Sequence, residues 1–287
     1  MKDLSILIPT FNDCCTTMVT ELQRQAAALS IGYEIIVADD GSTDQMVVET
    51  NRAINALPHC RVIERGFNSG RAAIRNFLAQ EARYPWLVFI DSDMVVCRDN
   101  YLQQYALSPC DSVTDGGVEV GEYQPGNLRY LYEKTCEPDH TVTARRKAPY
   151  KCFRTTNFMV RRDLMLAYPF DERFRYYGYE DVLFGKQLQE HAVDILHIDN
   201  PMKFQLFEPN DRFLSKTEEG LRTLHTFSRE LKGYSHLLDV VSRLSQLTPV
   251  IRLFYKLAGP WLRRQLAGSH PRILHFKLYR LGYYLSL

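Results

Sequence analysis

Apolar residues form four short runs in the first ninety positions, and a polar cluster and a helix-like segment follow each of the first three. The runs predict strands at residues 4–8, 33–38, 61–63 and 87–90, and the segments between them predict helices at about 14–29, 43–57 and 71–82. Asn12 or Asp13 is expected to cap the first helix, and Ser42 or Thr43 the second. Strands that alternate with helices of about 10 to 15 residues are typical of right-handed βαβ units in a parallel sheet covered on both faces.

The pattern changes after about residue 98. Short strands are expected at 112–114, 118–120 and 157–160, with a mobile loop at 136–151, then a helix at 180–191, a strand at 193–198 and a helix at 211–232. The rest of the chain is predicted to be helical. In doubly wound sheets ligands bind outside the carboxyl ends of the strands, so the polar clusters after the first, second and fourth strands should face one crevice.

Two aspartates end the fourth strand. Asp91 and Asp93 are separated only by Ser92, and side chains alternate faces in an extended strand, so both carboxylates should point the same way. Two carboxylates about 4 Å apart repel by roughly 4 kcal/mol at an effective dielectric constant of about 20, which favours a divalent cation or a shared proton between them. The alternative is an ordinary surface turn, because Asp-Ser-Asp is also common turn chemistry.

Composition and charge add two constraints. The 287 residues include 45% hydrophobic and 24% charged residues, which are the values of a folded globular chain. The seven cysteines are scattered without CxxC spacing, and the first residues lack a signal-like segment, so we expect reduced thiols in the cytoplasm. The charge is uneven, because residues 243–287 hold eight of the 35 Lys and Arg residues and no Asp or Glu.

With these elements in place, the sequence resembles the family 2 glycosyltransferases of the GT-A fold over residues 3–210. The motifs that carry the resemblance are residues 5–12 (SILIPTFN), 39–44 (DDGSTD), 68–70 (NSG) with Arg75-Asn76, 91–93 (DSD) and 178–181 (GYED). The resemblance implies a doubly wound, mostly parallel sheet with a nucleotide-binding half at 1–98, a smaller mixed acceptor half at 99–210 and a helical extension at 211–287. It also implies an inverting transfer from a nucleotide-diphosphate sugar, above all a UDP-sugar, to a saccharide or lipid-linked saccharide.

The resemblance assigns the metal and the nucleoside to the strand ends. Mn²⁺ or Mg²⁺ would be held by Asp93, with Asp91 as a second ligand or as a contact to the ribose, and Ser92 would lie beside the donor. Asp39 and Asp40 would accept hydrogen bonds from the uracil imide or a ribose hydroxyl, although an Asx turn explains the same motif. The residues that would line this pocket through backbone and ring contacts are Pro9, Thr10 and Phe11.

The same resemblance assigns the diphosphate and the base. Asn68, Arg71 and Arg75 would face the diphosphate where a loop opens a helix, with Arg75 favoured over Arg71; the alternative is an exposed helix face with solvated arginines. Asp181 would take the proton of the acceptor hydroxyl, with Glu180 as its neighbour or substitute. The alternative for these two acids is the first turn of a helix, where the helix dipole favours negative charge.

One position departs from the family pattern. Many relatives carry a histidine that completes the metal shell where this chain has Phe204, so metal affinity is expected to be weak or to depend on the donor. His197 is a candidate replacement, and the alternative is a structural histidine. The departure keeps open a nucleotide-sugar-binding scaffold subunit that has lost turnover. A nucleotidyltransferase is disfavoured because no glycine-rich phosphate loop follows the first strand.

The basic tail suggests a location. Residues 249–287 interleave aromatic, aliphatic and cationic residues, which is typical of helices that lie on an anionic membrane. Pro249, Pro260 and Pro271 are expected to divide the segment into short pieces, too short to span a bilayer. We therefore expect peripheral contact with the inner face of the membrane; the alternative is a helical cap on the catalytic domain or on a second subunit. No nucleic-acid-binding motif accompanies the tail.

Overall fold

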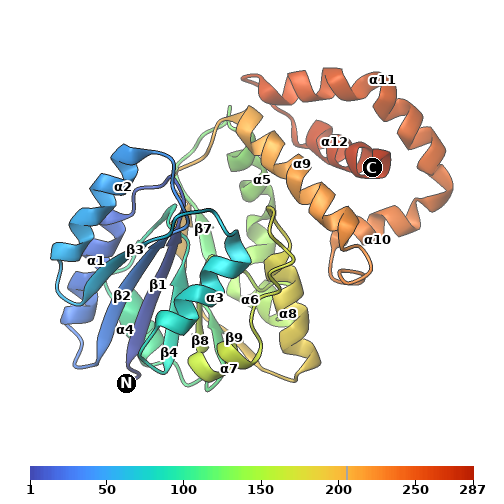
Figure 1. Cartoon of the computed structure of the whole chain (residues 1–287). Coiled ribbons are helices and arrows are strands. Elements are labelled where there is room, and N and C mark those ends of the chain that lie inside the picture. Colours follow the sequence, from blue (N-terminus) through green and yellow to red (C-terminus); the bar gives the residue numbers. More distant parts are fainter. Residues whose placement is uncertain (205) are drawn as a thin grey trace.

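A computed structural model describes residues 1–204 and 206–287 and shows a central sheet with helices on both faces, to which a group of C-terminal helices is attached (Figure 1). The sheet has seven strands. From one edge to the other they are β3 (Cys60–Glu64), β2 (Tyr33–Asp39), β1 (Leu4–Thr10), β4 (Trp86–Ile90), β8 (Asn157–Arg161), β6 (Val113–Asp115) and β9 (Ile195–His197). All seven lie within about two residues of predicted strands, so the predicted α/β class is confirmed.

The first four strands of the chain form the parallel half of the sheet. β1 pairs in parallel with β2 and with β4, and β2 with β3, whereas β8 runs antiparallel to both β4 and β6. The residues of β1, β2 and β4 are almost entirely buried, as expected for strands covered on both faces. Because β1, β2 and β4 are parallel, their carboxyl ends lie at the same end of the sheet, which is its upper end as drawn in Figure 1.

Two helical layers bury the faces of the sheet. On one face, Leu4, Ile6 and Ile8 of β1 pack with α1 (Thr16–Ala27) and α4 (Tyr101–Ala106). On the other, Leu7 of β1 packs with α3 (Arg71–Glu81), α7 (Arg162–Ala167) and α8 (Glu180–Glu190). The alternation of β1 side chains between the two clusters is the two-residue period of a strand. Each helix therefore buries one apolar face on the sheet.

The helix caps differ from the prediction. The residue before α1 is Cys15, whose side chain makes no cap hydrogen bond. α2 (Gln45–Arg52), which continues as the 3₁₀ turn η1 (Ala53–Ala56), is capped by Asp44, whose carboxylate accepts from the backbone N–H of Met46 at 3.0 Å. Asn12 does not cap α1, because its side-chain oxygen accepts from the backbone N–H of Asp44 at 3.0 Å. Ser42 Oγ accepts from the Asn12 backbone N–H at 2.7 Å, so these residues join the loops after β1 and β2.

Residues 136–151, expected as a mobile loop, are mostly helical. The end of α5 (Leu128–Cys136) is followed by η2 (Glu137–His140) and α6 (Val142–Lys147). Arg145 of α6 is buried and donates to Asp115 Oδ1 at 2.7 Å and to the Ile198 carbonyl at 2.8 Å. The prediction was wrong because a buried ion pair far apart in sequence, invisible to local composition, fixes this segment against the sheet.

A second, smaller sheet lies beside the carboxyl edge. It has the order β5 (Met94–Val95), β10 (Met202–Phe204), β7 (Val118–Val120), with β10 antiparallel to β5 and parallel to β7. Phe204 is paired in register with Met94, so this strand is placed directly next to Asp93. The small sheet thus connects the end of β4 to the region that follows β9.

The C-terminal helices are α9 (Asn210–Thr226), α10 (His236–Arg243), η3 (Ser245–Leu247), α11 (Thr248–Ala267) and α12 (Ile273–Ser286). They pack on one another through a cluster that includes Phe213, Leu262 and Phe276. Pro260 lies inside α11, so the expectation that prolines divide the tail was wrong at this position, although Pro249 does stand in the first turn of α11. No helix in the described residues is both long and apolar enough to cross a membrane.

Candidate functional site

The end of β2 holds a buried carboxylate with a free acceptor. Asp39 Oδ1 accepts from the Ser42 backbone N–H at 2.7 Å, whereas Oδ2 is buried and has no hydrogen-bond partner. A buried acceptor without a donor costs free energy, on the order of 1–3 kcal/mol. Asp39 therefore has the chemistry to accept a hydrogen bond from the N–H of a bound ring.

The end of β1 lies beside Asp39, because Thr10 pairs in register with this residue. Thr10 is buried and its hydroxyl donates to the Asp13 carbonyl at 2.9 Å, whereas the ring of Phe11 is exposed at the edge. Pro9 pairs in register with Ala38, the residue before Asp39. Asn12 has a positive φ of 54° and its side-chain oxygen accepts from the Thr43 backbone N–H at 2.8 Å. The loops after the two strands are thus held together around Asp39.

Asp40 has a different role from its neighbour. Its carboxylate accepts from the Ser69 hydroxyl at 2.6 Å and from the Gly70 backbone N–H at 2.9 Å, and Arg65 lies 3.7 Å away. These protein donors occupy the group that was expected to contact a nucleoside. Asp40 instead fixes the loop that opens α3, in which Asn68 is exposed.

Gly70 shows why that loop needs a glycine. It precedes α3 with a φ of 91°, and an added Cβ would lie 2.5 Å from the Arg175 carbonyl oxygen. Positive φ is readily adopted by glycine and is strained for most other residues. The turn therefore holds α3 close to the segment that leads to α8.

The end of β4 brings the two predicted aspartates together. Burial, and next the charge of Asp91, raise the pKa of Asp93, while the cations of Arg129 and Arg71 act against the rise. Ser92 lies in the turn between the two aspartates. The charges of Asp91 and Asp93 interact, although the two residues lie in a turn after β4 and not in the extended strand that the sequence predicts.

Arg75 ties this corner to α8. It is fully buried, and its guanidinium donates to Asp91 Oδ1 at 2.6 Å and lies 3.5 Å from Glu180 Oε1. The sequence analysis expected Arg75, more than Arg71, to face the diphosphate. In the structure the Arg75 guanidinium instead faces the carboxylates of Asp91 and Glu180. Arg71 has the more exposed side chain, lies 3.7 Å from the same Glu180 oxygen and stacks on the Tyr177 ring at 4.8 Å. Arg75 thus positions other side chains.

Asp181 stands at the start of α8, next to Glu180. The helix begins after Gly178 and Tyr179, both with positive φ (90° and 70°), and no side chain caps it. A tyrosine in the left-handed region is strained, and such residues cluster at functional sites. Burial, and next the charge of Glu180, raise the pKa of Asp181 to about 6. A carboxyl group with this pKa can exchange a proton near neutral pH.

Arg129 was not identified from the sequence. It lies in the first turn of α5, forms an ion pair with Glu208, lies 3.7 Å from Asp93 Oδ2, and stacks on the Phe204 ring at 4.8 Å. Burial disfavours its charge, but Glu208 and Asp93 outweigh this and raise the pKa of Arg129. No local pattern marks it, because its partners follow β4 and β10. Position 204, where a metal-shell histidine was expected, therefore holds a phenylalanine ring that the Arg129 guanidinium covers.

The corner fits a divalent cation through two ligands. Carboxylate oxygens suit Mg²⁺ and Mn²⁺, and a cation would relieve the repulsion that raises the pKa of Asp93. In the part of the chain that the structure describes, no group of three or more His, Cys, Asp or Glu residues could hold a metal ion. Further ligands would therefore have to come from the donor or from water.

His197 does not supply the missing ligand. It is buried at the end of β9, where Nδ1 lies 2.9 Å from Arg145 Nη1 and Nε2 lies 3.0 Å from the Pro149 carbonyl oxygen. Both ring nitrogens already have partners, and Arg145 and Asp115 surround the ring. The expectation of a metal-binding His197 is corrected to its structural alternative.

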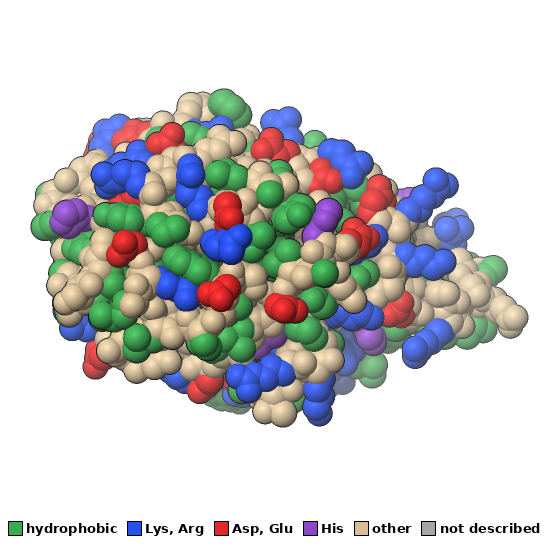
Figure 2. All heavy atoms as spheres, turned by 90° about the horizontal axis from the view of Figure 1, so that it is seen from below, with side chains coloured by type: hydrophobic (Ala, Val, Ile, Leu, Met, Phe, Trp, Pro, Cys, Tyr) green, Lys and Arg blue, Asp and Glu red, His purple; other side chains and the backbone are tan. Residues whose placement is uncertain are grey.

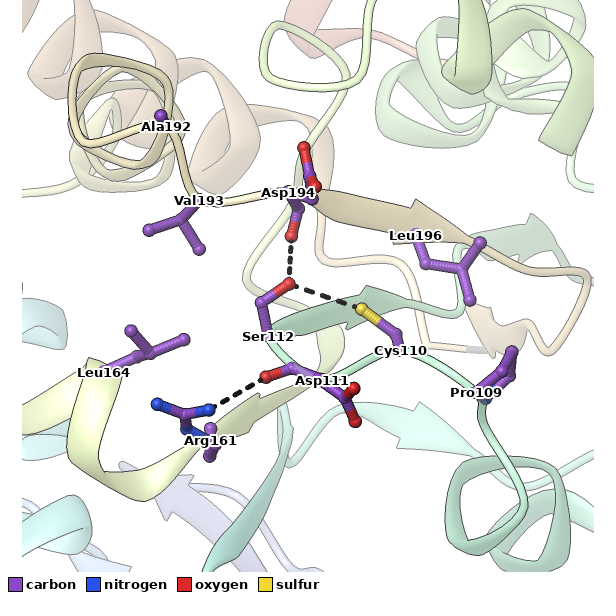
Figure 3. A pocket seen from close by; sticks show the side chains of 10 residues that line it. All are labelled: Pro109, Cys110, Asp111, Ser112, Arg161, Leu164, Ala192, Val193, Asp194 and Leu196. Carbon is purple, nitrogen blue, oxygen red and sulfur yellow. Dashed lines mark hydrogen bonds between the residues drawn. The ribbon is translucent and has the colours of Figure 1, made fainter.

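An open pocket in another part of the molecule is lined by none of the predicted site residues. Its volume is about 650 Å³, and Figure 3 shows Ser112, Arg161 and Asp194 among its walls. Ser112 and Asp194 precede β6 and β9, and Arg161 pairs with Trp86 at the start of β4, so the pocket lies at the end of the sheet opposite Asp91. This opposite face carries positive and negative side chains interspersed with hydrophobic ones (Figure 2).

Comparisons with known proteins identify the family of this chain. The sequence model of the family described as Glycosyl transferase family 2 matches residues 5–170, more than half of the chain. The chondroitin synthase of Pasteurella multocida (strain Pm70) is 22% identical over 250 residues, which cover 76% of this chain and 26% of that protein. The first three curated relatives are matched over only 26% to 41% of their own length.

Two solved structures share the fold. The mannosyltransferase PcManGT from Pyrobaculum calidifontis, in complex with GDP-Man and Mn²⁺, is 13% identical with a TM-score of 0.54, covering 99% of this chain and 87% of that one. S. aureus TarS 1-349, in complex with UDP-GlcNAc, is 19% identical with a TM-score of 0.50, covering 99% and 90%.

Proposed function

Because this chain belongs to glycosyl transferase family 2 and has its GT-A fold, we propose that it transfers a sugar, with inversion, from a UDP-sugar to a saccharide or lipid-linked saccharide. The observation that supports the proposal is the buried Arg75, which pairs with Asp91 after β4 and with Glu180, the neighbour of Asp181 at the start of α8. In this proposal the leaving group would be bound near Asp91 and Asp93, and the base would be Asp181, next to the Glu180 partner of Arg75.

Asp39 is the proposed contact to the base of the nucleotide. Its unpartnered, buried Oδ2 is suited to accept from the imide N–H of uracil, with Pro9, Thr10 and Phe11 around the ring. A guanine ring also presents N–H groups, and the two solved structures carry UDP-GlcNAc and GDP-Man. Asp40 would act indirectly, by fixing the loop that contains Asn68.

Asp93 and Asp91 are the proposed ligands of Mn²⁺ or Mg²⁺. When bound, the metal would neutralise the charge that develops on the diphosphate leaving group. Besides Arg75, which pairs with Asp91, the cations whose charges act on Asp93 are Arg129 and Arg71. These guanidinium groups would bind diphosphate oxygens directly and so share the neutralisation.

Asp181 is the proposed general base. The acceptor hydroxyl oxygen forms the new bond to the anomeric carbon, the bond between that carbon and the phosphate oxygen breaks, and the hydroxyl proton passes to Asp181. Glu180 would keep Arg71 and Arg75 in place through their ion pairs. An acceptor that is linked to lipid would be met at the inner face of the membrane, through peripheral contact of residues 249–287.

A ligand screen tests the donor site. Thermal unfolding of the protein would be followed with UDP-, GDP- and dTDP-sugars, with and without Mn²⁺, because a ligand that binds the native state stabilises it. A UDP-sugar should raise the melting temperature of the wild type and not that of Asp39→Ala. The matched control is Asp163→Ala, whose carboxylate is exposed and bonded to Arg161. The proposal is wrong if no nucleotide sugar raises the melting temperature.

A further inference from the structure

The helix α11 has two apolar faces. The inner face, with Gly259, Leu262 and Leu266 buried, packs with α9 and α12. The outer face carries five large apolar side chains that are between 46% and 76% exposed: Val250, Leu253, Phe254, Leu257 and Trp261. Their spacing of three and four residues places them in one row along the helix. We call these five residues the outer row.

The outer row belongs to a helix at the periphery of the molecule. In Figure 1, α11 lies at the outer edge of the molecule, with α12 and α9 between it and the sheet. A helix that only caps the domain would bury its apolar face and expose a polar one. Packing within this chain leaves between 46% and 76% of each outer-row side chain exposed. A contiguous exposed apolar surface marks an interaction site.

The segment that contains the outer row carries charge of one sign. Residues 243–287 contain eight Lys and Arg residues and no Asp or Glu. Among them, Lys256 and Arg264 are exposed on α11 itself. Blue side chains project from the right-hand part of Figure 2, where the C-terminal helices lie. A partner for this surface must therefore be apolar in its interior and negatively charged at its boundary.

We propose that the outer row inserts into the headgroup layer of an anionic lipid membrane. A helix with an apolar face beside Lys and Arg lies in this layer with its apolar side chains in the acyl boundary, and Trp261 suits the interface because its ring is amphipathic. Lys256 and Arg264 then meet lipid phosphates. A second copy of this chain fits less well, because pairing two such surfaces would bring like charges together.

Vesicle sedimentation of the whole chain tests the proposal. The vesicles contain phosphatidylcholine alone, or equal parts of phosphatidylcholine and phosphatidylglycerol. The wild type should sediment with the anionic vesicles, and the variant Leu253→Ser/Leu257→Ser/Trp261→Ser should remain in solution. The matched control is Met46→Ser/Leu107→Ser/Leu166→Ser, which removes three exposed apolar side chains of the catalytic domain and should bind like the wild type.

A charge variant and an oligomer measurement complete the test. Lys256→Gln/Arg264→Gln should lower partitioning to anionic vesicles by about fivefold for each charge removed. Equal melting temperatures of all variants show that the fold is intact. The proposal is overturned if the wild type ignores anionic vesicles or if the outer-row variant still binds them. It is also overturned if light scattering shows a dimer that this variant abolishes, without vesicle binding. Vesicle binding does not depend on the donor site, so the two proposals fail separately.

Discussion

Replacement of Arg75 by Met should destabilise the fold far more than loss of a surface ion pair of similar length. Arg75 is 1% exposed and lies 2.6 Å from Asp91 and 3.5 Å from Glu180, whose side chain is 2% exposed. Methionine is unbranched and adaptable, so the change removes mainly the charge and the donors. Removal of one partner from a buried ion pair costs about 3–5 kcal/mol, because the remaining charge is left buried without compensation.

Arg161→Met provides the matched control. Arg161 lies 2.5 Å from Asp163, but these side chains are 42% and 65% exposed, and an exposed pair contributes about 0–1 kcal/mol. Urea unfolding followed by circular dichroism would give the free energy of unfolding of each variant. Losses that agree to within about 1 kcal/mol would refute the claim that Arg75 is the central buried cation of the site.

Three further changes test other parts of the site. The transfer rate should fall as the pH drops below about 6, because Asp181 must be ionised to act as a base. Folding raises the pKa of Asp181 from 3.8, so it disfavours the ionised form, and the protein loses stability as the pH rises from about 4 to 6. In urea unfolding at pH 7, Asp181→Asn should therefore be more stable than the wild type by up to about 3 kcal/mol. At pH 3, where the carboxyl group is protonated in both states, this gain should be absent. Phe204→His should lower the Kd for Mn²⁺, measured by electron paramagnetic resonance, by about tenfold or more, and an unchanged Kd would show that position 204 does not face the corner. Gly70→Ala should lower the urea midpoint, because its Cβ would lie 2.5 Å from the Arg175 carbonyl oxygen, and an unchanged midpoint would contradict the turn geometry.

Much of the fold could be predicted because local patterns determine it. The buried strands of the parallel half are apolar runs, and each is ended by a polar cluster that is visible in the sequence. The helix α6 was missed because it is held by Arg145, which reaches Asp115 and Ile198 across tertiary contacts. Pro260 was read as a break, but it is accommodated inside a helix whose inner face is buried.

The surroundings of the individual site residues were harder to predict from the sequence than the fold. The sequence reasoning placed Asp91 and Asp93 in an extended strand, whereas β4 ends at Ile90 and the two aspartates lie in the turn that follows, where their charges interact. The sequence did not show that Arg75 is buried between two carboxylates and Arg71 more exposed, since burial of a helical residue depends on which neighbours cover it. Arg129 gave no signal at all, because its partners come from distant parts of the chain.

Donor binding and transfer by Asp181→Asn test the central claim most directly. Binding of the UDP-sugar found by thermal stabilisation would be measured by calorimetry, and transfer by release of UDP in the presence of acceptor. The variant should bind the donor like the wild type and transfer the sugar about 10²- to 10⁴-fold more slowly, the range in which a general base contributes. Transfer at the wild-type rate, or an equal loss of binding and transfer, would contradict the assignment of Asp181 as the base.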